Sequence, residues 1–249
     1  MADQILQVRN LRKSFGALLA SNNLSLSVTR GDVHALIGPN GAGKTTLVNQ
    51  ISGFLRPDSG SILFEKSDIV ALPAHRRAAM GLGRSFQITS IFEHLTVAEN
   101  LALAILAHNG HTFRFWRHCL SAPLVKQTLP EALERVDLDA RAELPARHLS
   151  HGEKKQLEVG MALVGNPKLL ILDEPMAGMG PGGTVEMSKL IRRLKATMTI
   201  LLVEHDMAAV FALADRITVL VYGAAIANGT PNEIRTDPEV RSAYLGEET

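Results

Sequence analysis

The sequence predicts an α/β fold in which a mixed, largely parallel sheet is joined by an N-terminal antiparallel β layer and an α-helical subdomain. Nearly continuous apolar runs are typical of parallel strands buried on both faces, and they occur at 33–37, 169–172 and 200–203. Runs at 5–11 and 24–28, separated by Gly16 and by residues 22–23, alternate apolar and polar residues, which favours antiparallel strands. Between 87 and 150 the pattern is helical, with no convincing strand.

Composition limits the classes of function. The chain has 249 residues and is 46% hydrophobic, enough for one large α/β domain or two small ones. Its 26 basic and 25 acidic side chains leave a formal charge of +1, so no broad positive field exists to hold a polyanion. Nucleic acid is therefore a disfavoured partner.

Cysteine content and hydropathy bear on location. Cys119 is the lone cysteine and cannot form an internal disulfide, which favours a reducing compartment. The first ten residues lack the apolar core of a secretory signal, and the most apolar stretches are far shorter than the roughly 20 residues that cross a bilayer. We expect a cytosolic location and a peripheral role if a membrane is involved.

Further elements are predicted from periodicity and from turn residues. Helices are expected at 97–108, 124–136 and 150–166. The segment 109–123 is expected to be an irregular, partly exposed insertion. Strands at 217–222 and 224–227 flank Gly223 as a hairpin, and short helices follow Pro231 and Pro238.

A phosphate-binding loop is predicted directly after the 33–37 strand and before a helix. The pattern G-x-x-x-x-G-K-[ST] is satisfied by Gly38, Pro39, Asn40, Gly41, Ala42, Gly43, Lys44 and Thr45. Its glycines let successive N–H groups converge on phosphate oxygens, and the helix N-terminus adds a positive dipole end. Lys44 is predicted to reach the β- and γ-phosphates of ATP, Thr45 to bind Mg²⁺ and Thr46 to donate near the α-phosphate. An ordinary turn is the alternative, which the strand and helix on either side disfavour.

The 169–172 strand ends in two carboxylates. Asp173 can hold the hydration shell of Mg²⁺, and Glu174 can polarise the attacking water as a general base. By itself, an acidic pair after an apolar run is as often a solvated strand end. Together with the phosphate loop, the pair predicts a P-loop NTPase core that uses ATP and Mg²⁺.

The segment 149–153, Leu-Ser-His-Gly-Glu, resembles the LSGGQ signature motif, and the chain resembles the ATP-binding subunits of ABC transporters. Gln87 matches the Q-loop of that family, His205 its switch histidine and 177–180 its D-loop. The resemblance covers essentially the whole chain from Phe15, which stands at the position of the adenine-stacking aromatic. The sequence departs from the family pattern at two positions. His151 replaces the first glycine of the signature pair, and Gly180 stands where many D-loops carry aspartate.

The resemblance implies roles for the matched residues. His205 would hydrogen-bond the γ-phosphate, and Gln87 would contact Mg²⁺ and relay its state to the helical subdomain. Each residue also has a simpler interpretation. His205 can be a satisfied, partly buried histidine, Gln87 an ordinary polar loop residue and Phe15 a part of the core.

The resemblance also implies an assembly. Two cassettes would pack head to tail, so that Ser150 and Gly152 of one chain bind the γ-phosphate held by Lys44 of the other. ATP binding would close the pair, and hydrolysis would let it open. The chain is then a single nucleotide-binding domain over 1–249. Its RecA-like core with the antiparallel β layer would comprise 1–87 and 165–249, and its helical signature subdomain about 88–164.

Further stretches resemble the branched-chain amino acid importer group, including its urea and short-amide relatives; they are 84–88, 91–97, 149–153, 173–179 and 243–246. This resemblance implies a homodimer, or a heterodimer with a paralogous ATP-binding subunit, at the cytoplasmic face of the cell membrane. Integral membrane permease subunits and, indirectly, a solute-binding protein are implied as partners.

Two other classes of function compete with the importer subunit. One is a soluble ABC ATPase acting on the ribosome or on DNA, which the single cassette and the near-neutral charge disfavour. The other is a non-catalytic regulatory cassette, which the presence of Lys44, Glu174, Gln87 and His205 disfavours.

Two further groups of residues lie outside the predicted site. A metal site at His108, His111, His118 and Cys119 is disfavoured, because the spacing fits no common zinc pattern. Arg76 and Arg77 are predicted to lie on a solvated face near the membrane partner.

Overall fold

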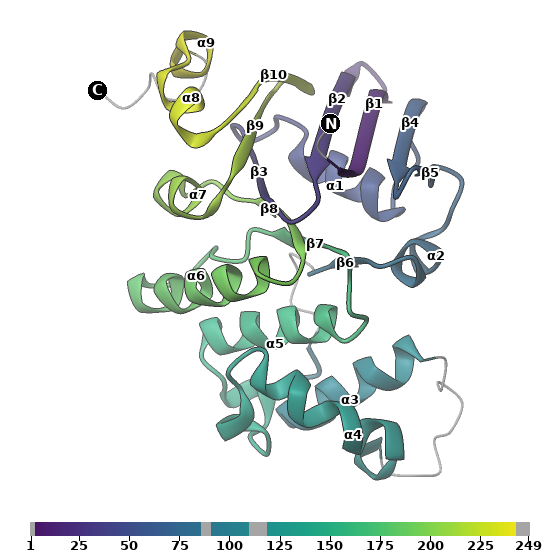
Figure 1. The fold of residues 1–249 in the computed structure, drawn as a ribbon, viewed down its shortest axis with the longest axis vertical. Helices are drawn as coiled ribbons and strands as arrows, with labels where there is room; N and C mark the ends of the chain where they lie inside the picture. Colours follow the sequence, from purple (N-terminus) through teal and green to yellow (C-terminus); the bar gives the residue numbers. More distant parts are fainter. Residues whose placement is uncertain (1–2, 86–90, 110–118, 243–249) are drawn as a thin grey trace.

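The computed structural model describes residues 3–85, 91–109 and 119–242, which form two sheets and surrounding helices (Figure 1). The antiparallel sheet contains β1 (Gln4–Phe15), β2 (Leu18–Thr29), β4 (Ser59–Phe64) and β5 (Ser67–Asp68), in the order β2-β1-β4-β5. The second sheet contains β3 (Val33–Ile37), β6 (Leu82–Arg84), β7 (Leu169–Asp173), β8 (Thr199–Val203), β9 (Arg216–Val221) and β10 (Ala224–Gly229). Its order is β10-β9-β3-β8-β7-β6, with β10 antiparallel to β9 and the other neighbours parallel. The predicted fold class is confirmed.

The buried parallel strands were predictable because they are apolar on both faces. Every residue of β3, β7 and β8 is buried, and the three strands lie where the sequence predicts them. The antiparallel strands are longer than predicted, at 12 residues each for β1 and β2. The predicted break at 22–23 is wrong: it lies within β2, where Asn23 has φ 51° and the strand continues. The inner strand β4 and the edge strands β5 and β6 were not predicted.

The helices are α1 (Lys44–Ser52), α2 (Ala74–Ala79), α3 (Val97–His108), α4 (Pro123–Glu134), α5 (His151–Leu163), α6 (Pro181–Lys195), α7 (Met207–Leu213), α8 (Pro231–Thr236) and α9 (Pro238–Val240). The predicted helix at 97–108 is confirmed, and that at 124–136 is shifted by one or two residues. The helix predicted at 150–166 is α5, which ends at Leu163 and begins one residue late because Ser150 caps it. Within the described ranges, no helix is long and apolar enough to cross a membrane.

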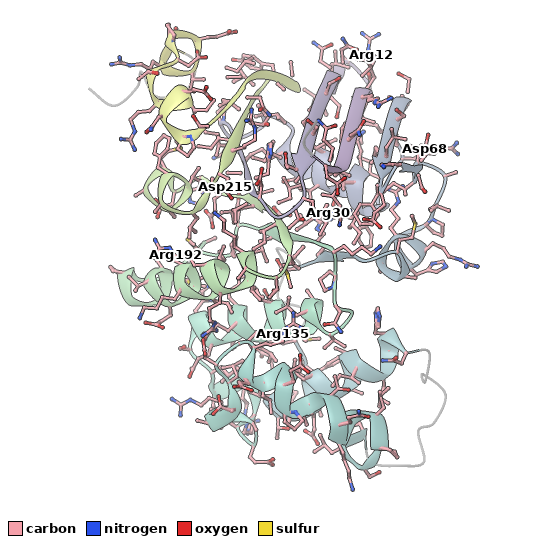
Figure 2. All side chains as sticks on the ribbon, viewed as in Figure 1. Arg12, Arg30, Asp68, Arg135, Arg192 and Asp215 are labelled. Atoms are coloured by element: carbon pink, nitrogen blue, oxygen red, sulfur yellow. The ribbon has the colours of Figure 1, made fainter. Side chains whose placement is uncertain are left out.

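The two faces of the second sheet are covered by different elements. Helix α1 lies between this sheet and the antiparallel sheet, where its Leu47 and Ile51 join a cluster with residues of β1, β2 and β7. On the opposite face, Leu170 and Leu172 of β7 pack in one cluster with α5, α6 and the helices α3 and α4. Figure 1 shows α3, α4 and α5 grouped at the end of the molecule away from the antiparallel sheet. Charged side chains such as Arg12 on β1 and Arg192 on α6 are exposed at the periphery (Figure 2).

The C-terminal hairpin is confirmed. Its two-residue turn consists of Tyr222 and Gly223, both with positive φ (47° and 77°). Such a turn matches the right-handed twist of the paired strands. The short helices α8 and α9 follow at the predicted prolines, each with proline in its first turn and a side-chain cap before it.

The prediction for Arg77 is wrong, because this side chain is buried rather than solvated. Arg77 is 2% exposed, and its guanidinium donates to four backbone carbonyl oxygens of Gln50, Ile51, Val70 and Leu72 at 2.6–3.1 Å. Two of these carbonyls belong to the last turn of α1, which a helix leaves without intrahelical partners. Arg77 therefore satisfies the C-terminal end of the helix that begins at the phosphate loop.

Candidate functional site

The phosphate loop connects β3 to α1 and fits tightly between two other strands. Gly38 and Gly43 have φ values of 150° and 101°. A Cβ atom on Gly38 would lie 2.1 Å from the carbonyl oxygen of Leu220 on β9, and one on Gly43 would lie 2.4 Å from that of Ala20 on β2. Both positions therefore require glycine, for the close approach as well as for the backbone angle.

The β9–β10 turn supports this loop from outside. Gly223 donates its N–H to the carbonyl oxygen of Ala42 at 2.9 Å, and it accepts the N–H of Asn22 at 2.8 Å. The loop, the hairpin and β2 are thus linked by main-chain hydrogen bonds. Sequence reasoning missed this support, because the three residues are far apart along the chain and carry no shared motif.

Lys44 is the first residue of α1, and its side chain lies against the phosphate loop. Its Nζ donates to the carbonyl oxygens of Gly38 at 2.5 Å and Pro39 at 3.0 Å, and the residue is 8% exposed. Burial lowers the pKa of Lys44, while the negative charges of Glu174 and Asp173 oppose that change. A partly desolvated ammonium group held by loop carbonyls can exchange them for phosphate oxygens, which form stronger charge-assisted hydrogen bonds.

The other residues of the predicted loop differ in exposure. Asn40 and Gly41 are exposed, whereas Ala42 is buried under the hairpin turn. Thr45 and Thr46 lie in the first turn of α1, with Thr45 exposed and Thr46 half-buried. The hydroxyl group of Thr45 is therefore accessible for a ligand.

The two predicted carboxylates lie at the carboxyl end of β7. Asp173 is 2% exposed, and Glu174 follows it with φ 50°. The N–H of Glu174 donates to the carbonyl oxygen of Val203 at 2.9 Å, which ties the turn to the end of β8. A non-glycine residue in the left-handed region is strained, and such residues cluster at functional turns. Because β3, β8 and β7 run parallel, their carboxyl ends place the phosphate loop and the carboxylates at one edge of the sheet.

Arg84, the last residue of β6, contacts the same carboxylate. Its Nη2 lies 2.9 Å from Oδ2 of Asp173, and the two side chains are only 9% and 1% exposed. Its Nη1 donates to Oδ1 of Asn49 on α1 at 2.7 Å. Sequence reasoning did not assign Arg84 to the site, because the strand β6 that positions it was not predicted.

His205 follows β8, and a buried glutamate precedes it. The carboxylate of Glu204 is fully buried and accepts the N–H of Met176 at 2.9 Å and that of His205 at 3.1 Å. Burial raises the pKa of Glu204, and these two N–H groups oppose that change. The side chain of His205 is 58% exposed, with Nδ1 3.8 Å from Oε2 of Glu204, which does not favour the alternative of a satisfied, partly buried histidine. Glu204 joins the segment after Glu174 to the His205 loop, a link that sequence reasoning missed.

The signature segment lies at the N-terminus of α5. The hydroxyl of exposed Ser150 accepts the N–H of Glu153 at 3.2 Å, and Oε2 of Glu153 accepts the N–H of Ser150 at 2.8 Å, which completes a capping box. Nε2 of His151 lies 3.0 Å from the carbonyl oxygen of Ala177, so the signature contacts the predicted D-loop of its own chain. Gly152 is half-buried in the first turn.

The aromatic and Q-loop predictions have different outcomes. Phe15 is 49% exposed at the end of β1, with Nζ of Lys13 5.6 Å from its ring centroid, so the core interpretation is wrong. Gln87 lies outside the described residues, as do His111 and His118.

The residues at the site fit a magnesium ion. The hydroxyl of Thr45 and the carboxylate of Asp173 are hard oxygen donors of the kind Mg²⁺ prefers, and this ion usually completes its shell with waters and phosphate oxygens. No group of three or more His, Cys, Asp or Glu side chains that could form a protein-only cage occurs among residues 3–85, 91–109 and 119–242.

The glycine-rich phosphate loop at the start of α1 and the buried carboxylate at the end of β7 define a P-loop nucleoside triphosphatase. The family described as ABC transporter matches residues 21–177, and the family described as branched-chain amino acid ATP-binding cassette transporter matches residues 226–249. The chain belongs to the ABC transporter family, as one of its ATP-hydrolysing cassettes.

Individual relatives agree with this assignment over the whole chain. The chain is 41% identical to LivG of Salmonella typhimurium, a high-affinity branched-chain amino acid transport ATP-binding protein, over 99% of the chain and 100% of the relative. It is 39% identical, with the same coverage, to the corresponding BraF of Pseudomonas aeruginosa. A crystal structure of the ADP conformation of an ABC transporter cassette is 34% identical, with a TM-score of 0.87, and the alignment covers 98% of this chain and 99% of that one.

Proposed function

We propose that the chain is the ATP-hydrolysing subunit of an ABC importer that takes up branched-chain amino acids or related small polar solutes through separate permease subunits. The observation that carries this proposal is the similarity to LivG and BraF, which extends over 99% of the chain and all of each relative. The family match at 226–249 supports the same solute group.

The site supports a division of labour in hydrolysis. Lys44 would bind the β- and γ-phosphates within the loop formed by residues 38–43, and Glu174 would act as general base for the attacking water. Mg²⁺, held by Thr45, Asp173 and Gln87, would neutralise charge on the phosphate oxygens. A main-chain hydrogen bond from the N–H of Glu174 to the carbonyl oxygen of Val203 constrains the backbone at Glu174, and this constraint favours a fixed position for its carboxylate.

The remaining predicted residues would complete the nucleotide site. The exposed side chain of His205 would contact the γ-phosphate, while the main-chain N–H of this residue donates to Glu204, and Thr46 would donate near the α-phosphate. The half-exposed ring of Phe15 would stack on adenine.

The cassette would act as a dimer, either with itself or with a paralogous ATP-binding subunit. Ser150 and Gly152 would bind the γ-phosphate held by the partner cassette. The exposed N-terminus of α5 supports this role, because a helix N-terminus offers N–H groups to an anion. Two chains closed around ATP would open when the γ-phosphate is removed.

A groove on the cassette supports a permease partner. It has a volume of about 570 Å³ and lies between α2, α3 and α5. Its apolar lining consists of Ala78, Ala79, Ala104, Ala107, Met161 and Ala162. Small side chains from three helices leave room for a short helix of the permease. Glu158 also lines the groove; its carboxylate pairs with Lys155 at 3.0 Å through Oε2, while Oε1 has no hydrogen bond in the described part of the chain. A basic or amide side chain on the permease helix would satisfy it.

The proposal includes the organisation and location of the chain. Residues 1–249 would form one nucleotide-binding domain, with a core of 1–87 and 165–249 and a helical subdomain of about 88–164. A shared cluster of buried side chains from β7, α3, α5 and α6 supports a single domain. Binding to permeases would place the chain peripherally at the cytoplasmic face of the membrane, with a solute-binding protein as an indirect partner. A ribosomal role is not favoured, because the relatives are transport proteins.

Replacement of the general base tests hydrolysis. Glu174→Gln should keep ATP binding and lower steady-state turnover by about 100-fold or more, because general-base catalysis contributes at least that much. Glu186→Gln, at an exposed glutamate on α6, is the matched control and should keep the parent rate. Turnover near the parent rate in the Glu174 variant would remove this residue from the role.

Two experiments test the transport assignment. Affinity purification from detergent-solubilised membranes should recover integral membrane permeases, whereas ribosomal proteins would support the alternative. Uptake of labelled leucine, urea and short amides should then be compared between a strain lacking the chain and the same strain complemented with it. Unchanged uptake of all three solutes on deletion would contradict the proposed solute class.

A further inference from the structure

Arg84 lies between the nucleotide site and the groove. It is the last residue of β6, which pairs in parallel with β7, so that Arg84 aligns with Ile171 two residues before Asp173. This register brings its guanidinium to Oδ2 of Asp173 at 2.9 Å and leaves Oδ1 outside the ion pair. The same side chain lines the groove between α2, α3 and α5.

The guanidinium also contacts the helix that begins at the phosphate loop. Nη1 donates to Oδ1 of Asn49 at 2.7 Å, and the guanidinium carbon lies 5.8 Å from the ring centroid of Phe54, just beyond the end of α1. Asn49 lies one turn after Thr45, which is a predicted metal ligand. Arg84 therefore links the two elements that carry Thr45 and Asp173, two of the three predicted protein ligands of Mg²⁺, namely α1 and the end of β7.

The geometry of this contact favours orientation of the carboxylate over simple neutralisation of charge. A guanidinium is planar and presents its donors in a fixed fork, so binding Asn49 with one nitrogen fixes the direction in which the other meets Asp173. A buried ion pair is in general a weak source of stability, since desolvation offsets its attraction. Residues that orient a metal ligand from outside its coordination shell commonly change metal affinity about 10- to 100-fold when replaced.

We propose that Arg84 is a positioning residue for the metal site: it holds the carboxylate of Asp173 in the orientation that binds Mg²⁺ and fixes that orientation relative to α1. This inference rests on the proposed function, because it takes Asp173 as the metal carboxylate. Arg84 itself touches neither nucleotide nor metal.

Arg77 provides a matched control for this role. Both arginines have largely buried side chains, and both contact α1 or its end, but the hydrogen bonds of Arg77 go to main-chain carbonyls rather than to Asp173. Lysine at either position keeps the positive charge but lacks the planar set of N–H donors of the guanidinium group. A purely structural role for Arg84 therefore predicts that the two lysine variants behave alike at the metal.

The test measures metal binding without hydrolysis. The dissociation constant of a fluorescent, slowly hydrolysed ATP analogue is measured on the purified chain in excess EDTA and in excess Mg²⁺. By thermodynamic linkage, the dissociation constant in EDTA divided by that in Mg²⁺ reports how strongly the protein favours the metal-bound nucleotide. Arg84→Lys should lower this ratio toward one, by up to about 10-fold, and change the value in EDTA less than twofold. Arg77→Lys should keep the wild-type ratio, even if it lowers the melting temperature.

Asn49→Ala tests the same idea without altering Arg84 or Asp173. It removes the second anchor of the guanidinium from α1, so the ratio should fall in the same direction by a smaller factor. If Arg84→Lys and Arg77→Lys change the ratio equally, or if Arg84→Lys weakens binding equally in EDTA and in Mg²⁺, the inference is wrong while the proposed function stands. A wild-type chain that binds the analogue without any effect of Mg²⁺ also overturns it. A wild-type chain that does not bind the analogue at all contradicts the proposed function itself.

Discussion

His34 lies on β3, the strand that leads into the phosphate loop, and it is completely buried. Burial lowers the pKa of His34 from 6.5 to about 4, and the positive charge of Arg216 acts in the same direction. Nε2 of the ring lies 2.7 Å from the hydroxyl oxygen of Thr218 on β9. When a base has a lower pKa in the folded state than in the unfolded state, the free energy of unfolding is highest at pH above the unfolded pKa. This stability is lost as the pH falls from the unfolded pKa toward the folded pKa.

The size of the effect follows from the two pKa values. The difference between 6.5 and about 4 corresponds to about 3 kcal/mol when both states are fully titrated. Linkage between protonation and unfolding then gives a loss of about 2 kcal/mol at pH 5 and about 3 kcal/mol at pH 4, relative to pH above 7. This is a large part of the stability of a typical domain, about 5–15 kcal/mol.

Urea unfolding at pH 7.5, 6, 5 and 4.5 measures this effect, with His34→Gln as the variant. The difference in unfolding free energy between wild type and His34→Gln should shift by about 2 kcal/mol between pH 7.5 and pH 5. Only the wild type carries an imidazole at position 34 that is buried in the folded state and binds a proton once unfolding exposes it. His75→Gln, at an exposed histidine, is the control and should follow the wild-type pH dependence. Parallel pH profiles for the wild type and His34→Gln would refute the reasoning.

Three further changes test other parts of the structure. Gly38→Ala should abolish ATP-analogue binding and lower the melting temperature, because the new Cβ would lie 2.1 Å from the carbonyl oxygen of Leu220; binding at the parent affinity would contradict the tight loop. Arg77→Met should cost about 2–4 kcal/mol in urea unfolding, because it removes the guanidinium donors from four carbonyl oxygens, two of them at the end of α1, whereas Arg76→Met at an exposed position should change stability by less than about 0.5 kcal/mol. Asp206→Ala should cost about 1 kcal/mol, because Oδ1 of this residue caps α7; calorimetry would detect the loss, and Asp206→Asn should restore most of it.

The phosphate loop, the two carboxylates and the central strands were predictable because each is encoded by consecutive residues. Residues 38–45 carry the whole pattern for phosphate binding, and the apolar run of β7 ends directly at Asp173. Periodicity also predicted α3, whose Thr96–Glu99 capping box marks its start.

The partners of these residues were not predictable in the same way. Arg77 and Arg84 lie at the two ends of the short stretch 77–84, and nothing in that stretch says that one arginine binds Asp173 and the other the end of α1. The pairing of β6 with β7 and the packing of α2 on α1 decide it. Glu204 likewise gains its role only because the ends of β7 and β8 lie side by side.

The sequence by itself thus determined the class of chemistry, the ligand-binding loop and the positions along the chain of the central strands that carry it, since these depend on local patterns along the chain. Only the tertiary structure decided which charged side chains support the site, which glycines are fixed by close contact, and where the groove lies. These features depend on contacts between segments far apart in the chain, and such contacts exist only after the sheet has been assembled and the helices have packed on its two faces.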